Sequence, residues 1–261
     1  MFESQYSEAV LASMQSAYGE GFLSPGGARE VADIVNGIPL QGWEVLDLGC
    51  GIGGASVMLA REFGAGRVLG IDLEPSSIEQ ATRFVAEAGL GDRVTVKLAA
   101  PGPLPVSDAS FDLVFSKDVI CHVPDKPAFF AEVFRVLRPG GLFASGDWIK
   151  GADGPGSEAF QVWVGFLRES GLIFHFEEGE AYRGAFEAAG FEAIELRDHS
   201  DWSRAEAQRQ LDHIVGPARD SLRQSLGEEK LAARERQTRA RIEALAGGGL
   251  RHGHLRARKP A

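Results

Sequence analysis

Two acidic residues that belong to apolar runs, 25 positions apart, have the types and spacing of a nucleoside-binding site. Asp47 lies in the first run and is followed by Gly49, Gly51 and Gly53, and Asp72 ends the second run. Glycines let a backbone approach a ligand where a Cβ would collide. An acid at the tip of the second strand of a doubly wound sheet accepts hydrogen bonds from a ribose diol. The pattern therefore predicts a site for an adenosine-containing cofactor.

The same loop bears on which cofactor binds. A dinucleotide fingerprint has a third glycine where this chain has Ala55-Ser56. Asp47 would repel a pyrophosphate and attract a cationic amino group. The run DLGCGIGG at 47–54, followed by GID at 70–72, resembles the signature of class I S-adenosylmethionine (SAM) dependent methyltransferases. That resemblance implies that SAM lies with its adenosine toward Asp72 and its methionine end toward Asp47, and that S-adenosylhomocysteine is the product. The alternative for the protein is a nicotinamide-dependent oxidoreductase. The alternative for Asp72 is a role as the N-cap of the following helix.

Strands and helices alternate over 43–148, which predicts a parallel sheet with helices on both faces. We expect an α/β, doubly wound, seven-stranded Rossmann-like sheet, and the methyltransferase resemblance implies the order 3-2-1-4-5-7-6. The expected strands are 44–48, 67–71, 93–98, 111–115, 142–145, 191–196 and 250–258. We expect one methyltransferase domain over 1–261. Its parts would be a helical cap (1–40), a SAM-binding core (41–148) and two insertions on the acceptor side (149–190 and 200–248).

Composition limits the class of partner. The formal net charge of -10 argues against a nucleic-acid substrate, because phosphate-backbone binding relies on Lys and Arg. The two cysteines, Cys50 and Cys121, form no disulfide or metal-ligand framework, and we expect no metal. No signal peptide is recognisable, and no apolar stretch approaches the ~20 residues of a membrane span. We expect a cytoplasmic monomer or homodimer that acts on a small molecule, with neither nucleic acid nor membrane as partner.

Four further segments carry a second, more specific resemblance. They are Gln5-Tyr6, the stretch 18–27, the SKDVICH run at 116–122 and the last ten residues, 251–260. Together they resemble the phosphoethanolamine N-methyltransferase family. From the residues themselves, His122 is the best general-base candidate, since an imidazole titrates near neutrality.

The family resemblance assigns several roles. It implies a catalytic pair formed by Tyr6 and His122, and an acid, Asp118, that contacts the substrate amine, with Gln5 nearby. It also implies that Leu23, Ser24 and Lys117 help enclose SAM. Leu73 should pack on the adenine. Many relatives carry an acid just after the third strand, but this chain has Ala99-Ala100, so backbone groups there would replace that contact.

Aromatic side chains on the acceptor side could hold a methylated cation. Trp148, Trp163 and Tyr182 are the candidates, with a role in the core as the alternative. The segment 160–182 lacks the tyrosines and the arginine that bind phosphate in that family, and a cap tyrosine is replaced by Met14. We therefore expect a small amine other than phosphoethanolamine. An O- or C-methyltransferase of a small natural product, and a SAM-binding protein without activity, remain alternatives.

Overall fold

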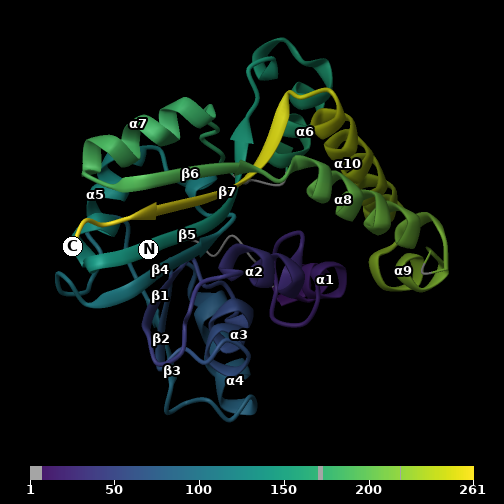
Figure 1. The fold of residues 1–261 in the computed structure, drawn as a ribbon. Coiled ribbons are helices and arrows are strands. Elements are labelled where there is room, and N and C mark those ends of the chain that lie inside the picture. Colours follow the sequence, from purple (N-terminus) through teal and green to yellow (C-terminus); the bar gives the residue numbers. More distant parts are fainter. Residues whose placement is uncertain (1–7, 170–172, 218) are drawn as a thin grey trace.

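The computed structural model describes residues 8–169, 173–217 and 219–261 and is built around one seven-stranded sheet (Figure 1). The strand order is β3-β2-β1-β4-β5-β7-β6, which confirms the predicted order. The first five strands in this order are parallel, and β7 is antiparallel to both β5 and β6. The strands are β1 (Glu44–Leu48), β2 (Arg67–Asp72), β3 (Val94–Leu98), β4 (Phe111–Lys117), β5 (Leu137–Lys150), β6 (Glu192–Asp198) and β7 (Leu250–Arg258).

The two faces of the sheet bury alternate residues of the central strands, as a period of two requires. Val45 of β1 and Leu113 of β4 belong to one apolar cluster, whereas Leu46 and Val114 belong to the other. Helices α2 (Gly27–Val35), α3 (Gly54–Arg61) and α4 (Pro75–Glu87) contribute to the first cluster. Helices α5 (Lys126–Val136) and α7 (Gly179–Ala189) contribute to the second. The central strands are therefore buried on both sides, which explains their nearly continuous apolar sequence.

Strand β5 is much longer than the predicted segment 142–145. It begins at Leu137 and includes Pro139-Gly140-Gly141, a sequence that normally indicates a turn. Nine consecutive residues of β5, from Leu142 to Lys150, pair with β7 from Arg258 back to Leu250. This long antiparallel pairing extends β5 toward its carboxyl end and places β7 between β5 and the edge strand β6.

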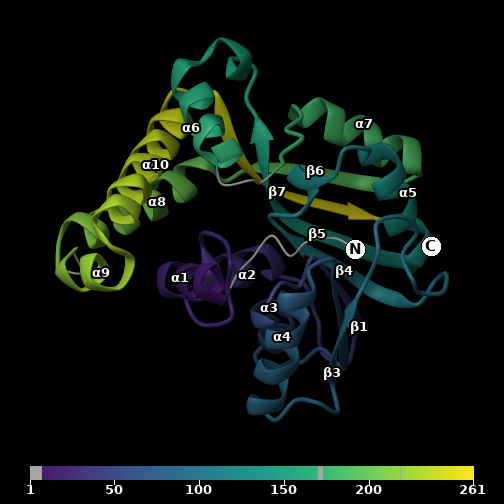
Figure 2. The same ribbon diagram turned by 180° about the vertical axis from the view of Figure 1, so that it is seen from behind.

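The remaining helices form a second layer beside the carboxyl ends of the parallel strands (Figures 1 and 2). They are α1 (Glu8–Tyr18), α6 (Glu158–Glu169), α8 (Ser200–Val215), α9 (Arg219–Leu226) and α10 (Glu228–Ala246). Helix α10 packs against α6 and α8, and a third apolar cluster that includes Trp148 and Trp163 joins α6 and α10 to β5. The segment 149–190, which we expected to form one insertion, is therefore divided between two places. Helix α6 packs in this second layer, whereas α7 covers one face of the sheet. None of the helices in the described part of the chain has the length and apolar character needed to cross a membrane.

Candidate active site

The glycine loop connects β1 to α3 at the carboxyl edge of the sheet. Gly49, Gly51 and Gly53 have φ angles of 70°, 53° and 89°, a region that side chains with a Cβ rarely adopt. A Cβ on Gly51 would also lie 3.3 Å from Leu23 Cδ1. The cap residue Leu23 therefore covers the loop closely. The three glycines thus adopt the backbone conformation that favours glycine, at the positions where the sequence predicted the turn.

Asp72 stands at the end of β2 and fixes this loop. Its Oδ2 accepts a hydrogen bond of 2.8 Å from the Gly51 amide, and its Oδ1 accepts one of 2.9 Å from the Glu74 amide. Burial raises the pKa of the Asp72 carboxyl. Helix α4 has Glu74, not Asp72, as its N-cap residue. The carboxylate thus joins the glycine loop to the turn that precedes α4.

Asp47 is buried beneath the loop. The Ser56 hydroxyl donates a hydrogen bond of 2.6 Å to its Oδ2, and the residue is only 1% exposed. Burial raises the pKa of Asp47 to about 7. The sequence suggested an acid that attracts a cationic amino group at this position, and the structure adds that the pKa of this acid lies near neutrality. Sequence reasoning noted Ser56 only as a departure from a glycine pattern and missed its role as the partner of Asp47.

The proposed adenine side is apolar and open. Leu73 is 54% exposed and Leu98 is 52% exposed, unusual values for large aliphatic side chains. Ala100 is exposed and Ala99 is half-buried. The Ala99 amide already donates a hydrogen bond of 2.8 Å to the Asp72 carbonyl, so it is not free to contact a ligand. Of the two expected backbone positions, Ala100 is therefore the better candidate.

Lys117, at the end of β4, joins the cap to the sheet. Its Nζ donates to Ser24 Oγ at 2.7 Å and to the Pro25 carbonyl at 2.6 Å. It also forms ion pairs with Asp118 at 2.6 Å and with Glu30 at 3.0 Å. Although burial opposes the charge, these carboxylates raise the pKa of Lys117 above its usual value. The ammonium is therefore permanently charged and occupied by internal oxygen atoms, which fixes Ser24 against the sheet.

The turn after β4 is held from below by Asp147 of β5. This buried carboxylate accepts hydrogen bonds from the amides of residues 119, 120 and 121 at 3.0, 2.6 and 3.1 Å. It also accepts one of 2.7 Å from the Trp148 amide. Burial raises the pKa of Asp147 to about 6. Asp147 therefore sets the path of the chain that carries Asp118 and His122, a role that the sequence did not indicate.

His122 lies in a short 3₁₀ helix, η1 (Ile120–His122), at this turn. Its Nδ1 is 2.7 Å from the Ile173 carbonyl, and its ring centroid is 4.2 Å from that of Phe174. A carbonyl only accepts, so Nδ1 carries the proton and the neutral ring has its lone pair on Nε2. Burial lowers the pKa of His122. The side chain is thus held in the neutral tautomer that can act as a base.

The other residues expected at the acceptor side are distributed between the site and the core. Asp118 is buried, has a φ of 56° and keeps Oδ1 without a hydrogen-bond partner among the described residues. The rings of Trp148 and Trp163 are 5.7 Å apart and nearly buried. Tyr182 is fully buried against Phe130 in the core under α5, so it no longer belongs among the candidate substrate contacts. Gln5 and Tyr6 lie outside the described residues.

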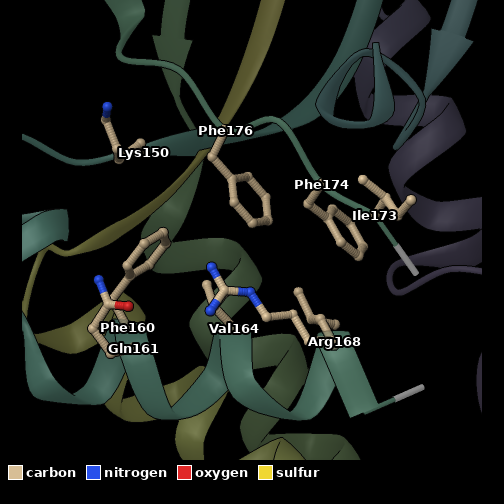
Figure 3. A pocket seen from close by; sticks show the side chains of 9 residues that line it. Lys150, Phe160, Gln161, Val164, Arg168, Ile173, Phe174 and Phe176 are labelled. Atoms are coloured by element: carbon tan, nitrogen blue, oxygen red, sulfur yellow. The ribbon is translucent and has the colours of Figure 1, made fainter. Parts of the chain in front are cut away.

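A cavity of about 420 Å³ lies between α6 and the segment that follows residue 172 (Figure 3). Rings from both sides line it, and Arg168 of α6 extends across it (Figure 3). Phe174 connects this cavity to the active-site turn, because the same ring contacts His122. The lining residues are Lys150, Phe160, Gln161, Val164, Leu167, Arg168, Ile173, Phe174 and Phe176.

Comparison with known proteins agrees with this arrangement. A family of methyltransferase domains matches residues 45–141. Phosphoethanolamine N-methyltransferase 1 of Arabidopsis thaliana is 31% identical over 211 residues, which cover 80% of this chain and 41% of that protein. The chain thus spans about two fifths of the length of this relative. Methyltransferase GfsG of Streptomyces halstedii is 36% identical over 191 residues, covering 73% of this chain and 66% of that protein.

Solved structures show the same fold. Phosphoethanolamine N-methyltransferase 2 of Haemonchus contortus, in complex with phosphomonomethylethanolamine and S-adenosylhomocysteine, superposes with a TM-score of 0.89. It is 24% identical, and the match covers 98% of this chain and 58% of that chain. A putative sarcosine dimethylglycine methyltransferase from Galdieria sulphuraria gives a TM-score of 0.79 at 22% identity, covering 97% of each chain. The family match over 45–141, the sheet order and the sequence likeness show that the chain contains a class I methyltransferase domain, similar in sequence to the phosphoethanolamine N-methyltransferases.

Proposed function

We propose that this chain transfers a methyl group from SAM to the nitrogen of a small amine, with His122 as the general base. The observation that carries the proposal is the state of His122. Its Nδ1 proton is engaged by the Ile173 carbonyl, and burial lowers its pKa, so Nε2 is free to accept a proton at neutral pH. Asp118 lies on the same turn, and its Oδ1 has no hydrogen bond in the described part of the chain, with His252 Nε2 at 3.6 Å. This carboxylate oxygen is suited to hold and orient an amine.

SAM, when bound, supplies an electrophilic methyl group on a sulfonium. His122 Nε2 would take the proton from the substrate ammonium, which would leave the nitrogen lone pair available to accept that methyl group, with the neutral thioether as the leaving group. The residues contribute mainly by alignment, because holding the reacting atoms in line supplies much of the acceleration. Tyr6 is proposed as a second proton acceptor on the family resemblance alone.

We assign the substrate to the cavity between α6 and the segment that follows residue 172, and this cavity favours a substrate with an apolar part. Three phenylalanines and three aliphatic side chains line it, and Arg168 and Lys150 are the cationic side chains among its lining residues. A carboxylate on such a substrate would find a partner in Arg168. The same cavity supports the second candidate, O-methylation of a small natural product, since a phenol or alcohol also needs a base at the position of His122. An amino acid or other amine with an apolar side chain is the class that we place first.

A screen with labelled methyl donor and product mass spectrometry tests the proposal. Amines, amino acids, phosphobases and phenols are compared, and the bond to the new methyl group is located in each product. We expect N-methylation, with kcat lowered at least about 100-fold by His122→Gln, in the range typical of general bases, while affinity for S-adenosylhomocysteine stays within about twofold. His213→Gln, at the exposed end of α8, is the matched control. Equal loss of turnover and cofactor affinity in His122→Gln would instead assign His122 to cofactor binding.

A further inference from the structure

Three buried side chains converge where the cap meets the C-terminal strand. Glu30 comes from α2, and His252 and His254 come from β7. Residues two apart on a strand share a face, so both imidazoles face the same helix. Glu30 Oε1 lies 3.1 Å from His252 Nε2 and 3.8 Å from His254 Nε2. The three residues are 1%, 1% and 5% exposed.

The atoms that point toward one another have no hydrogen-bond partner. Among the residues that the structure describes, Glu30 Oε1, His252 Nε2 and His254 Nε2 are all buried and without such a partner. Buried polar groups are nearly always satisfied, and each exception in a native fold needs an explanation. Three exceptions at one point indicate that something binds there.

Lys117 does not satisfy these three atoms, because its Nζ pairs with the other carboxylate oxygen of Glu30 and with Asp118 Oδ2. The distance from Lys117 Nζ to Glu30 Oε2 is 3.0 Å, whereas His252 Nε2 faces Glu30 Oε1. A proton on His252 would satisfy only one pair. The neighbouring carboxylates of Glu30 and Asp118 raise the pKa of His252 although burial opposes this. A proton on Nε2 would bond Glu30 Oε1 at 3.1 Å, with Asp118 Oδ1 farther away at 3.6 Å. His254 Nε2 would still lack a partner.

We propose that Glu30, His252 and His254 bind one divalent transition-metal ion of the Zn²⁺ type. Two imidazole nitrogens and one carboxylate oxygen are a common zinc ligand set, with a fourth position left for water or another ligand. The three ligand atoms all lie within 4.8 Å of one another. Zinc bonds of about 2.1 Å in tetrahedral geometry place donor atoms about 3.4 Å apart, so small rotations of these side chains complete the site. The ion would tie α2 of the cap to β7.

The backbone leaves room for this arrangement. Gly146 of β5 pairs with His254 across the sheet. A Cβ on Gly146 would lie 2.8 Å from Glu30 Oε1. Glycine at this position therefore allows the carboxylate to reach the imidazoles.

Metal content is the direct test, and it does not depend on methyl transfer. The untagged full chain is stripped with a chelator, desalted, given Zn²⁺, desalted again and analysed by mass spectrometry of the metal. We expect about one equivalent of zinc to remain. Co²⁺ added instead should give the visible absorption of a four- or five-coordinate site. His254→Gln and Glu30→Gln should weaken binding by at least about tenfold, the effect that even outer-sphere substitutions produce. His213→Gln, which is exposed, should retain the metal.

Two results would overturn the proposal. One is wild-type protein that loses all zinc on desalting and gives no Co²⁺ absorption, as expected if protons alone stabilise the cluster. The other is a folded His254→Gln protein that binds zinc as tightly as the wild type. If the ligand variants do not fold, the wild-type zinc and cobalt measurements still decide. Methylation assayed with and without chelator separates this site from the proposed activity. The protein can methylate without binding metal, and it can bind metal without methylating.

Discussion

The carboxyl group of Asp47 makes a quantitative prediction about pH. Burial raises its pKa to about 7 when no ligand is bound, so near neutrality about half of the molecules carry a proton there. We propose that the amino group of S-adenosylhomocysteine lies beside this carboxyl. An opposite charge within a few ångströms lowers a carboxyl pKa by 1–3 units, so we take a pKa of about 5 in the complex. Binding should then release a proton over the pH range in between.

The magnitude follows from these two values. With the pKa falling from about 7 to about 5, the dissociation constant should be about eightfold larger at pH 6 than at pH 7.5. About 0.8 proton should be released per ligand at pH 6. The sign is fixed, because the protonated acid must lose its proton to pair with the ammonium, so affinity rises as pH rises.

Isothermal titration calorimetry measures both quantities, with two buffers of different ionisation enthalpy at each pH. Asp47→Asn is the matched variant, since it keeps the shape and cannot titrate. It should bind more weakly and show a flat pH profile, and its profile also subtracts any titration of the ligand itself. A wild-type affinity that does not change between pH 6 and 7.5 would refute the reasoning, as would an unchanged pH dependence in Asp47→Asn.

Three further substitutions test other parts of the site. Asp147→Asn should destabilise the fold by roughly 2–4 kcal/mol, because one amide oxygen replaces a carboxylate that accepts four backbone hydrogen bonds; chemical denaturation measures this, and an unchanged midpoint would contradict it. Gly51→Ala should weaken S-adenosylhomocysteine binding measured by calorimetry, because its φ of 53° strains a residue with a Cβ, and wild-type affinity would argue against a role for this loop. Leu73→Ser should lower affinity about tenfold with little change in thermal stability, since the side chain is 54% exposed until a ligand covers it; a loss of stability without loss of affinity would show a role in folding instead.

Much of the fold could be predicted because the parallel strands correspond to apolar runs in the sequence that are bounded by turn residues. The segment 250–258 was predicted as a strand with the bounds of β7, and 44–48 with those of β1. Strand β5 was predicted too short, since its first residues contain a proline and two glycines that locally favour a turn. Backbone hydrogen bonds between Gly140, Gly141 and Lys259 hold this first part extended, and β7 pairs with the rest of β5 from Leu142 on. Partners more than one hundred residues away are not visible in a local pattern.

Local sequence also determined part of the candidate site. The glycine loop and Asp72 follow from spacing, because a turn directly after a buried strand must lie at the carboxyl edge of the sheet. Tertiary structure decided the rest. Only the fold shows that Asp147 holds the turn of His122 and that the cap delivers Ser24 and Glu30 to Lys117. It also places Tyr182 in the core and sets the pKa of Asp47, because both depend on burial by segments that are distant along the chain. Sequence thus determined which groups are present and where the strands that carry the glycine loop and Asp72 lie, whereas their environment, and with it their charge, came from long-range packing.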